Sequence, residues 1–142
     1  MANVLYDVGR NYFLNGSINW LTNAIRVQLV SISNQPTAYV FNASLDTVFA
    51  SVPTGARGGF SMASLGTKTA TSGIADAADA VFSGVSGPTV GALIVTVSTA
   101  TANANDWPMI AYIDTATGMP VGPNGGDITV QWDNATNRIS KL

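Results

Sequence analysis

Hydrophobic side chains near the start of the chain recur at helical spacing. Leu5, Val8 and Tyr12 fall at positions i, i+3 and i+7, and polar residues lie largely between them. Asn15-Gly16 follows, and glycine is typical of the position just beyond a helix. We therefore predict a short amphipathic N-terminal helix within residues 1–16.

The remaining regular patterns are typical of strands. Residues 25–29 alternate apolar and polar side chains, which predicts a strand with one buried face. Residues 90–97 and 109–113 are almost unbroken apolar runs, as expected of strands that are covered on both faces. Residues 128–132 alternate again, after a stretch, 114–127, that is rich in glycine and proline. These short strands predict a mainly β fold, a β-sandwich or a related barrel, with a short N-terminal helix.

The middle of the chain is less regular. Residues 38–41 are compatible with a strand, and residues 45–49 with one helical turn that begins at Ser44 and ends before Pro53. Residues 54–66 are rich in glycine, serine and alanine, so we expect a flexible loop or arm there. No repeat or linker divides the sequence, which predicts a single β-rich domain over residues 1–142.

Turn chemistry also predicts the role of Asn124-Gly125-Gly126. The segment lacks the spacing of a phosphate-binding loop, so we interpret it as a hairpin turn between the last strands.

The composition excludes most enzyme chemistry. The 142 residues contain no histidine, cysteine or glutamate, which removes serine and cysteine triads and thiolate metal sites. Paired carboxylates are still present, as Asp76 with Asp79 and as Asp114 with Asp127, and such pairs can hydrolyse glycosides or bind calcium. Aspartate is also the ordinary residue of turns, which is the interpretation we favour. We predict a protein that is not an enzyme, with no cofactor and no metal site.

The charge content is unusually low. Charged residues make up 10% of the chain and the net charge is −2, whereas soluble domains average about 25% charged residues. No cluster of lysine and arginine is present, so we expect neither nucleic acid nor membrane as a partner. No basic segment followed by an apolar run opens the sequence, and we therefore expect synthesis in a host cytoplasm without a secretory signal. A chain with so few charges is poorly soluble as a monomer unless its surface is buried by assembly into an oligomer or is made polar by serine, threonine and asparagine. We favour assembly.

Two parts of the chain are candidates for contacts with other subunits. Aromatic residues crowd the first twenty positions, and aromatics dominate both cores and interfaces. Core packing is the expected role for most of them. The other candidate is the weakly charged segment 54–66. The candidate interface residues are Leu5, Tyr6, Tyr12, Phe13, Trp20, Arg57, Phe60 and Met62.

Several segments, taken together, resemble a family of small virion structural proteins of tailed bacteriophages. The resemblance covers most of the chain and is most specific between residues 110 and 133. The chain differs from that pattern at Leu21-Thr22-Asn23 and at residues 58–64. The segments that carry the resemblance are 4–7, 13–14, 18–20, 25–30, 52–57, 73–79, 110–114 and 123–133.

The resemblance implies a component of a capsid or tail. The specific expectation is a head-decoration, or cement, protein that binds the outside of the shell as a homotrimer and ties major capsid proteins together. The expected location is the exterior of the virion capsid. A neck or tail component and a virion-exposed glycan-binding module are the alternatives.

Overall fold

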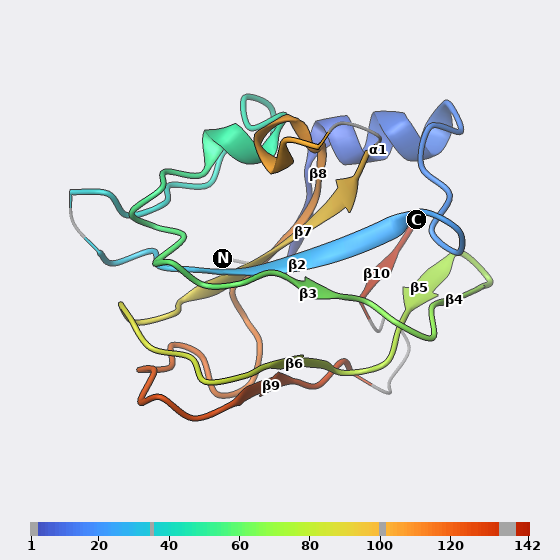
Figure 1. Ribbon diagram of the computed structural model, residues 1–142. Helices are drawn as coiled ribbons and strands as arrows, with labels where there is room; N and C mark the ends of the chain where they lie inside the picture. Colours follow the sequence, from blue (N-terminus) through green and yellow to red (C-terminus); the bar gives the residue numbers. More distant parts are fainter. Residues whose placement is uncertain (1–2, 35, 100–101, 134–138) are drawn as a thin grey trace.

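The computed structural model describes residues 3–34, 36–99, 102–133 and 139–142. Its central element is an antiparallel five-stranded sheet (Figure 1). The order of the strands in this sheet is β1 (Val4–Leu5), β8 (Met109–Ile113), β7 (Ala92–Ser98), β2 (Ala24–Val30) and β3 (Ala63–Ser64). The longest pairing joins β2 to β7 over their full length, from Ala24 opposite Ser98 to Val30 opposite Ala92.

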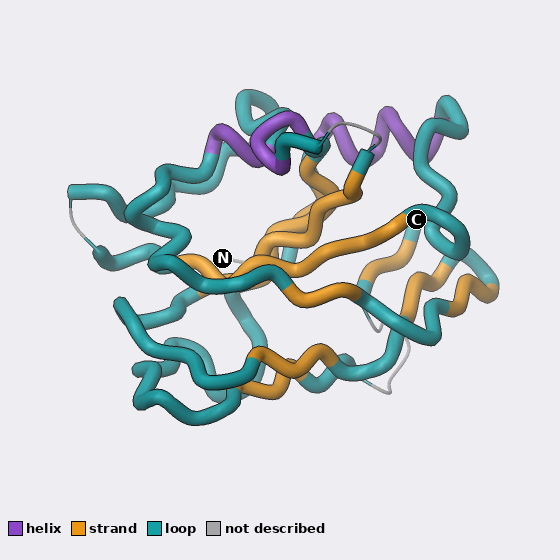
Figure 2. The backbone as a smooth tube through the Cα atoms, viewed as in Figure 1, coloured by secondary structure: helices purple, strands orange, loops and turns teal. Residues whose placement is uncertain are grey.

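Two smaller antiparallel sheets lie beneath the central sheet in the view of Figure 1. One contains β10 (Ser140–Lys141), β5 (Ile74–Asp76) and β4 (Thr69–Thr71), and the other pairs β6 (Ala80–Phe82) with β9 (Ile128–Val130). The short helices lie above the central sheet, as Figure 2 shows. They are α1 (Asp7–Leu14), η1 (Phe49–Ser51) and η2 (Ala104–Asp106).

Each face of the central sheet contributes to a separate hydrophobic cluster, because successive side chains of a strand point to opposite faces. The main cluster lies between the central sheet and the two small sheets, and it includes Ile25, Val27 and Leu29 of β2 with both Trp20 and Trp132. A second cluster lies between the central sheet and the helical layer. It includes Tyr6, Tyr39, Phe49, Met109 and Tyr112. This layered arrangement confirms the predicted mainly β, sandwich-like single domain with a short N-terminal helix.

The N-terminal helix is shorter than the predicted range of 1–16. It begins at Asp7, because Val4 and Leu5 pair with β8 as a strand. The Tyr6 N–H donates to the carbonyl oxygen of Ile110 at 3.0 Å, which holds this residue against the sheet. The helix ends as expected beside Asn15 and Gly16, and Gly16 has the positive φ of 75° that favours glycine.

The interpretation of Asn124-Gly125-Gly126 as a hairpin turn is wrong. The strands on either side, β8 and β9, belong to different sheets, and β9 pairs with β6. The turn instead extends the β6–β9 pairing, since Gly125 N–H donates to the carbonyl of Val85 at 2.8 Å and Val85 N–H donates to Gly126 at 2.9 Å.

The segment 54–66 packs against the central sheet and does not project as an arm. Part of it forms β3, which pairs with β2. The carbonyl of Ala56 accepts the Ser31 N–H at 2.8 Å, and the buried amide of Gln28 donates to the carbonyl of Phe60 at 3.2 Å. The sheet therefore holds this glycine-rich segment by hydrogen bonds at several points.

Residues 38–49 also differ from the prediction. Residues 38–41 form no strand, and the short helical element begins at Phe49, where Ser44 does not cap it. Asn42 instead supports a separate turn, because its Oδ1 accepts the N–H groups of Ser44 and Leu45 at 3.1 and 3.0 Å. No helix in the described part of the chain is long and apolar enough to cross a membrane.

Candidate functional site

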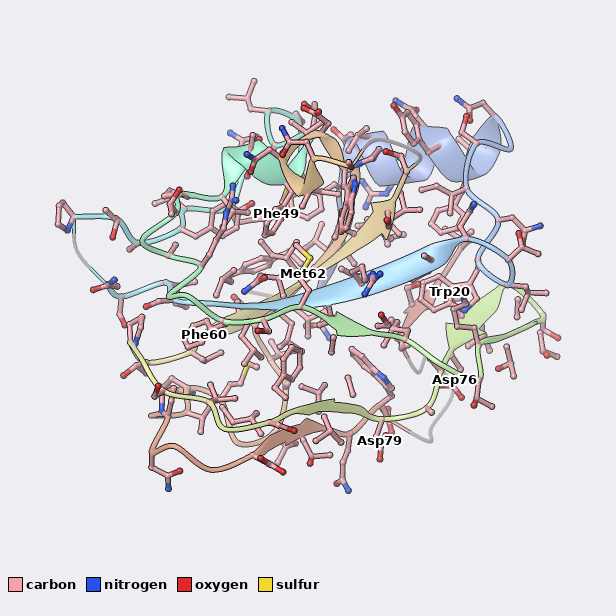
Figure 3. All side chains as sticks on the ribbon, in the orientation of Figure 1. Trp20, Phe49, Phe60, Met62, Asp76 and Asp79 are labelled. Atoms are coloured by element: carbon pink, nitrogen blue, oxygen red, sulfur yellow. The ribbon has the colours of Figure 1, made fainter. Side chains whose placement is uncertain are left out.

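The aromatic candidates at the N-terminus divide into core and partly buried residues. Tyr6 is completely buried and Trp20 is 6% exposed, so both belong to the interior. Trp20 Nε1 donates to the carbonyl of Asp76 at 3.1 Å, which ties the N-terminal region to β5 (Figure 3). Neither side chain offers a surface to a neighbouring protein in this fold, because burial and hydrogen bonding already occupy them.

Leu5, Tyr12 and Phe13 are partly buried. They pack against the main hydrophobic cluster from β1 and from the inner side of α1. Gly9 allows this close approach of the helix to the sheet, since a Cβ at this position would lie 2.8 Å from the carbonyl oxygen of Ile110. The structure thus assigns packing contacts to these three residues and leaves part of each side chain accessible.

Arg57 joins three segments of the helical layer. Its Nε donates to the carbonyl of Val52 at 2.9 Å, and its Nη2 donates to the carbonyl of Phe49 at 2.8 Å. Its Nη1 donates to Asn105 Oδ1 at 2.8 Å, and the guanidinium lies 4.1 Å from the centre of the Phe49 ring. Burial lowers the pKa of Arg57 from its usual value, and the carbonyl partners fit a group that remains charged. We infer a structural role for Arg57.

Phe60 and Met62 pack on different clusters. Phe60 contacts the main hydrophobic cluster and Met62 contacts the second one. Both line a cleft of about 180 Å³ between residues 59–63 and residues 81–86. None of the described residues that line this cleft carries a charge, so the cleft supplies no group for acid–base chemistry.

The most exposed apolar side chains lie in the helical layer. We use the name helical face for three such side chains, Leu14 at the end of α1 and Val40 and Leu45 on the loop before η1, whose exposed fractions are 86%, 81% and 76%. The loop that carries Val40 and Leu45 is fastened to the start of α1, because Asp7 N–H donates to the carbonyl of Ala43 at 3.0 Å. Sequence reasoning missed the exposure of Val40 and Leu45, since apolar residues in irregular segments give no periodic signal that separates exposed from buried positions.

Two of the carboxylates that were candidates for chemistry, Asp79 and Asp127, accept hydrogen bonds from backbone N–H groups. Asp79 Oδ1 accepts the N–H of Trp132 at 3.1 Å, and Asp127 Oδ1 accepts the N–H of Gly84 at 2.9 Å. Asp46 Oδ2 accepts the Tyr39 hydroxyl at 2.5 Å. The contacts of Asp79 and Asp127 join segments that are far apart in the sequence, and they are not the local turn contacts expected from the sequence.

No group of three histidine, cysteine or acidic side chains that could hold a metal ion lies within residues 3–34, 36–99, 102–133 and 139–142.

Comparison with protein-family models and with curated proteins finds no match to this chain.

Proposed function

We propose that this chain is a non-enzymatic structural protein of a tailed-bacteriophage virion, specifically a capsid decoration (cement) protein. In this proposal it binds the outer shell and stabilises the contacts between major capsid proteins. The resemblance described above motivates the choice of family. The observation that carries the role is the exposed apolar helical face of Leu14, Val40 and Leu45.

The helical face supports an assembly role because exposed apolar area is costly for a free protein. Burying one such side chain at an interface contributes about 1.5–3 kcal/mol. The weak charge of the chain lowers the cost of desolvating the surface around it. The repeated shell multiplies this modest contribution, since many symmetric copies engage at once.

The carboxylate contacts support a non-enzymatic role. Asp46, Asp79 and Asp127 each accept hydrogen bonds from groups that fix the fold. A catalytic pair needs carboxyl groups aimed at a shared substrate site. The cleft between residues 59–63 and 81–86 contains no carboxylate among its described lining residues.

A glycan-binding module receives less support from the described residues. Such a module is expected to present an outward cluster of aromatic side chains. In the described part of the chain, every aromatic side chain is buried or partly buried. Trp20 and Trp132 direct their indole N–H groups to the backbone carbonyls of Asp76 and Ala78.

Point substitutions on the helical face test the proposal. Deletion of residues 1–14 would also remove Tyr6 and Gly9 from the packed interior, so loss of assembly would report unfolding as well as lost contact. The double substitution Val40→Thr with Leu45→Asn changes exposed side chains. The matched control is Val81→Thr, which changes a side chain that is 52% exposed on β6.

The measurement is the occupancy of purified variants on particles of the encoding phage that lack this protein. We expect occupancy to fall by about tenfold or more for the helical-face variant, equivalent to about 1.4 kcal/mol. We expect no change for Val81→Thr. Full occupancy with the helical-face variant would overturn this assignment of the contact surface.

Copy number distinguishes the shell from the neck or tail. A decoration protein follows the symmetry of the shell, so each virion contains on the order of hundreds of copies. A neck or tail ring contains about six or twelve copies. Quantitative mass spectrometry of purified virions measures this number. A count near six or twelve would replace the decoration role with a neck or tail role.

A further inference from the structure

An open groove lies at the β1 edge of the sandwich. β1 is the terminal strand of the central sheet and β10 is the terminal strand of the three-stranded sheet, so within the described residues each strand has one edge without a paired strand. The space between them has a volume of about 490 Å³. It is lined by residues 3–5, Arg10, residues 111–113 and residues 139–141. We call this space the edge groove.

Part of the β1 backbone is directed away from β8. Tyr6 N–H donates to β8 at 3.0 Å, and hydrogen-bonding direction alternates along an antiparallel strand. The N–H and C=O of Leu5 therefore point away from β8, toward the free edge. On the other strand, Ile139 N–H donates to the carbonyl of Ala75 in β5 at 3.2 Å, and Leu142 N–H donates to the carbonyl of Gly73, the residue before β5, at 2.9 Å.

The floor of the edge groove is apolar. Ile113 and Ile139 are 5% and 6% exposed and belong to the main hydrophobic cluster, and Leu5 packs against that cluster. An extended chain lying along β1 would direct every second side chain to this floor, because the side chains of a strand alternate with period two.

The charge of the edge groove is opposite to that of the whole chain. Arg10 and Lys141 lie among the described lining residues, which include no acid, although the net charge of the chain is −2. Arg10 Nη1 is paired with Asp7 Oδ1 at 2.9 Å in a half-exposed position. That contact uses one of the five donors of the guanidinium, which leaves others for an incoming carboxylate.

We propose that the edge groove binds an extended segment of another protein, which adds as a strand beside β1 and alternates apolar with acidic side chains. Backbone hydrogen bonds to Leu5 provide the register, the floor holds the apolar side chains, and Arg10 and Lys141 attract the acidic ones. The proposal rests on the function proposed above, in which the segment belongs to the shell protein.

The first test uses a capped heptapeptide that alternates valine and aspartate. Binding is followed by amide chemical shifts of isotope-labelled protein. We expect saturable shifts centred on Leu5 and Lys141. A peptide N-methylated at alternate residues cannot complete the strand pairing, and a peptide with lysine in place of aspartate has the wrong charge. Absence of shifts, or equal shifts with the N-methylated peptide, would contradict the proposal.

Two substitutions in the protein test the same contact with an unchanged peptide. Leu5→Pro removes an N–H that points away from β8, so pairing of β1 with β8 is retained, while Lys141→Glu reverses a charge. We expect each to weaken peptide binding about tenfold or more. Ala70→Glu, on the exposed edge strand β4, is a charge control that alters the net charge by one unit, against two for Lys141→Glu, and it should bind like the parent. If Leu5→Pro fails to fold, Lys141→Glu against Ala70→Glu still decides the outcome.

Two further outcomes separate this proposal from its alternatives. If the purified protein self-associates and Lys141→Glu abolishes that association, the occupant is a second copy and the proposal is wrong. If the peptide fails to bind while the helical-face variant still loses occupancy, the edge groove is wrong and the decoration role stands. Peptide binding by a protein that has no affinity for the shell would overturn the decoration role instead.

Discussion

The hydroxyl groups of Tyr6 and Tyr39 are 2.6 Å apart and share a hydrogen bond in the second hydrophobic cluster. Tyr39 in turn donates to Asp46 Oδ2 at 2.5 Å. This chain of hydrogen bonds fastens the loop of residues 39–46 to the junction between β1 and α1. The exposed residues Val40 and Leu45 therefore belong to a loop that this hydrogen-bond network holds in place.

Substitution of Tyr39 by phenylalanine should destabilise the protein. The change leaves the buried Tyr6 hydroxyl and the Asp46 carboxylate each without one partner, at a cost of about 1–3 kcal/mol. Urea denaturation followed by tryptophan fluorescence measures the free energy of unfolding. Tyr12→Phe is the control, because the Tyr12 hydroxyl has no hydrogen-bond partner among the described residues. Equal stability of both variants would contradict a role for the hydrogen-bonded chain.

Alkaline pH should destabilise the fold through three tyrosines. Burial raises the pKa of Tyr6 and of Tyr39 from the usual 10.0, and it raises the pKa of Tyr112 to about 12. A raised pKa in the folded state means that stability is complete below pH 10.0 and is lost as the pH rises toward and through the folded-state pKa. The loss for each tyrosine is about 1.4 kcal/mol per pH unit in that window. Urea denaturation at pH 9, 10 and 11 checks the sign, and constant stability across this series would contradict it.

Gly9→Ala should destabilise the protein although alanine favours helices. The added Cβ would lie 2.8 Å from the oxygen and 2.9 Å from the Cα of Ile110, and both atoms belong to the backbone of β8. Overpacking of this kind costs about 1–3 kcal/mol, which exceeds the gain of about 1 kcal/mol in helix propensity. Asn11→Ala, at an exposed position of the same helix, isolates the propensity effect and should stabilise slightly. Thermal unfolding measures the stability of both variants. A Gly9→Ala variant more stable than the parent would exclude the close contact between Gly9 and the backbone of Ile110.

Arg57→Lys should weaken the helical layer. Lysine cannot reproduce the planar set of donors that reaches Val52, Phe49 and Asn105, and the loss should be about 2 kcal/mol. Arg10→Lys provides the comparison at a half-exposed ion pair, where the expected loss is about 1 kcal/mol or less. Chemical denaturation measures the free energy of unfolding of both variants. Similar losses of stability would show that the contacts of Arg57 do not stabilise the helical layer more than an exposed ion pair does.

The purified protein should be a trimer if it assembles before it reaches the shell. Three-fold assembly would cover part of the weakly charged surface in each subunit. Multi-angle light scattering at micromolar concentration measures the mass directly. A mass equal to one chain of 14.7 kDa would count against a pre-formed trimer and would place trimerisation, if it occurs, on the capsid.

The local pattern of side chains was enough to predict the main elements. The alternation at residues 25–29 became β2, the apolar run at 109–113 became β8, and the helical spacing near the N-terminus became α1. The predictions of β2 and α1 succeeded because burial of one face imposes a period of two on strands and 3.6 on helices. The prediction of β8 succeeded because a strand that is covered on both faces is apolar throughout. The absence of histidine, cysteine and glutamate likewise restricts the available chemistry without any knowledge of the fold.

Only the tertiary structure decided which elements meet. β9 pairs with β6 although β8 precedes it in the chain. Tyr6 lies in the core although it was among the aromatic candidates for an interface. Arg57 joins loops that are far apart in the sequence. The helical face and the edge groove are also products of this assembly. Spacing along the chain reports the exposure of a residue within its own element, whereas a partner strand, a buried guanidinium or an open sheet edge depends on contacts between distant segments.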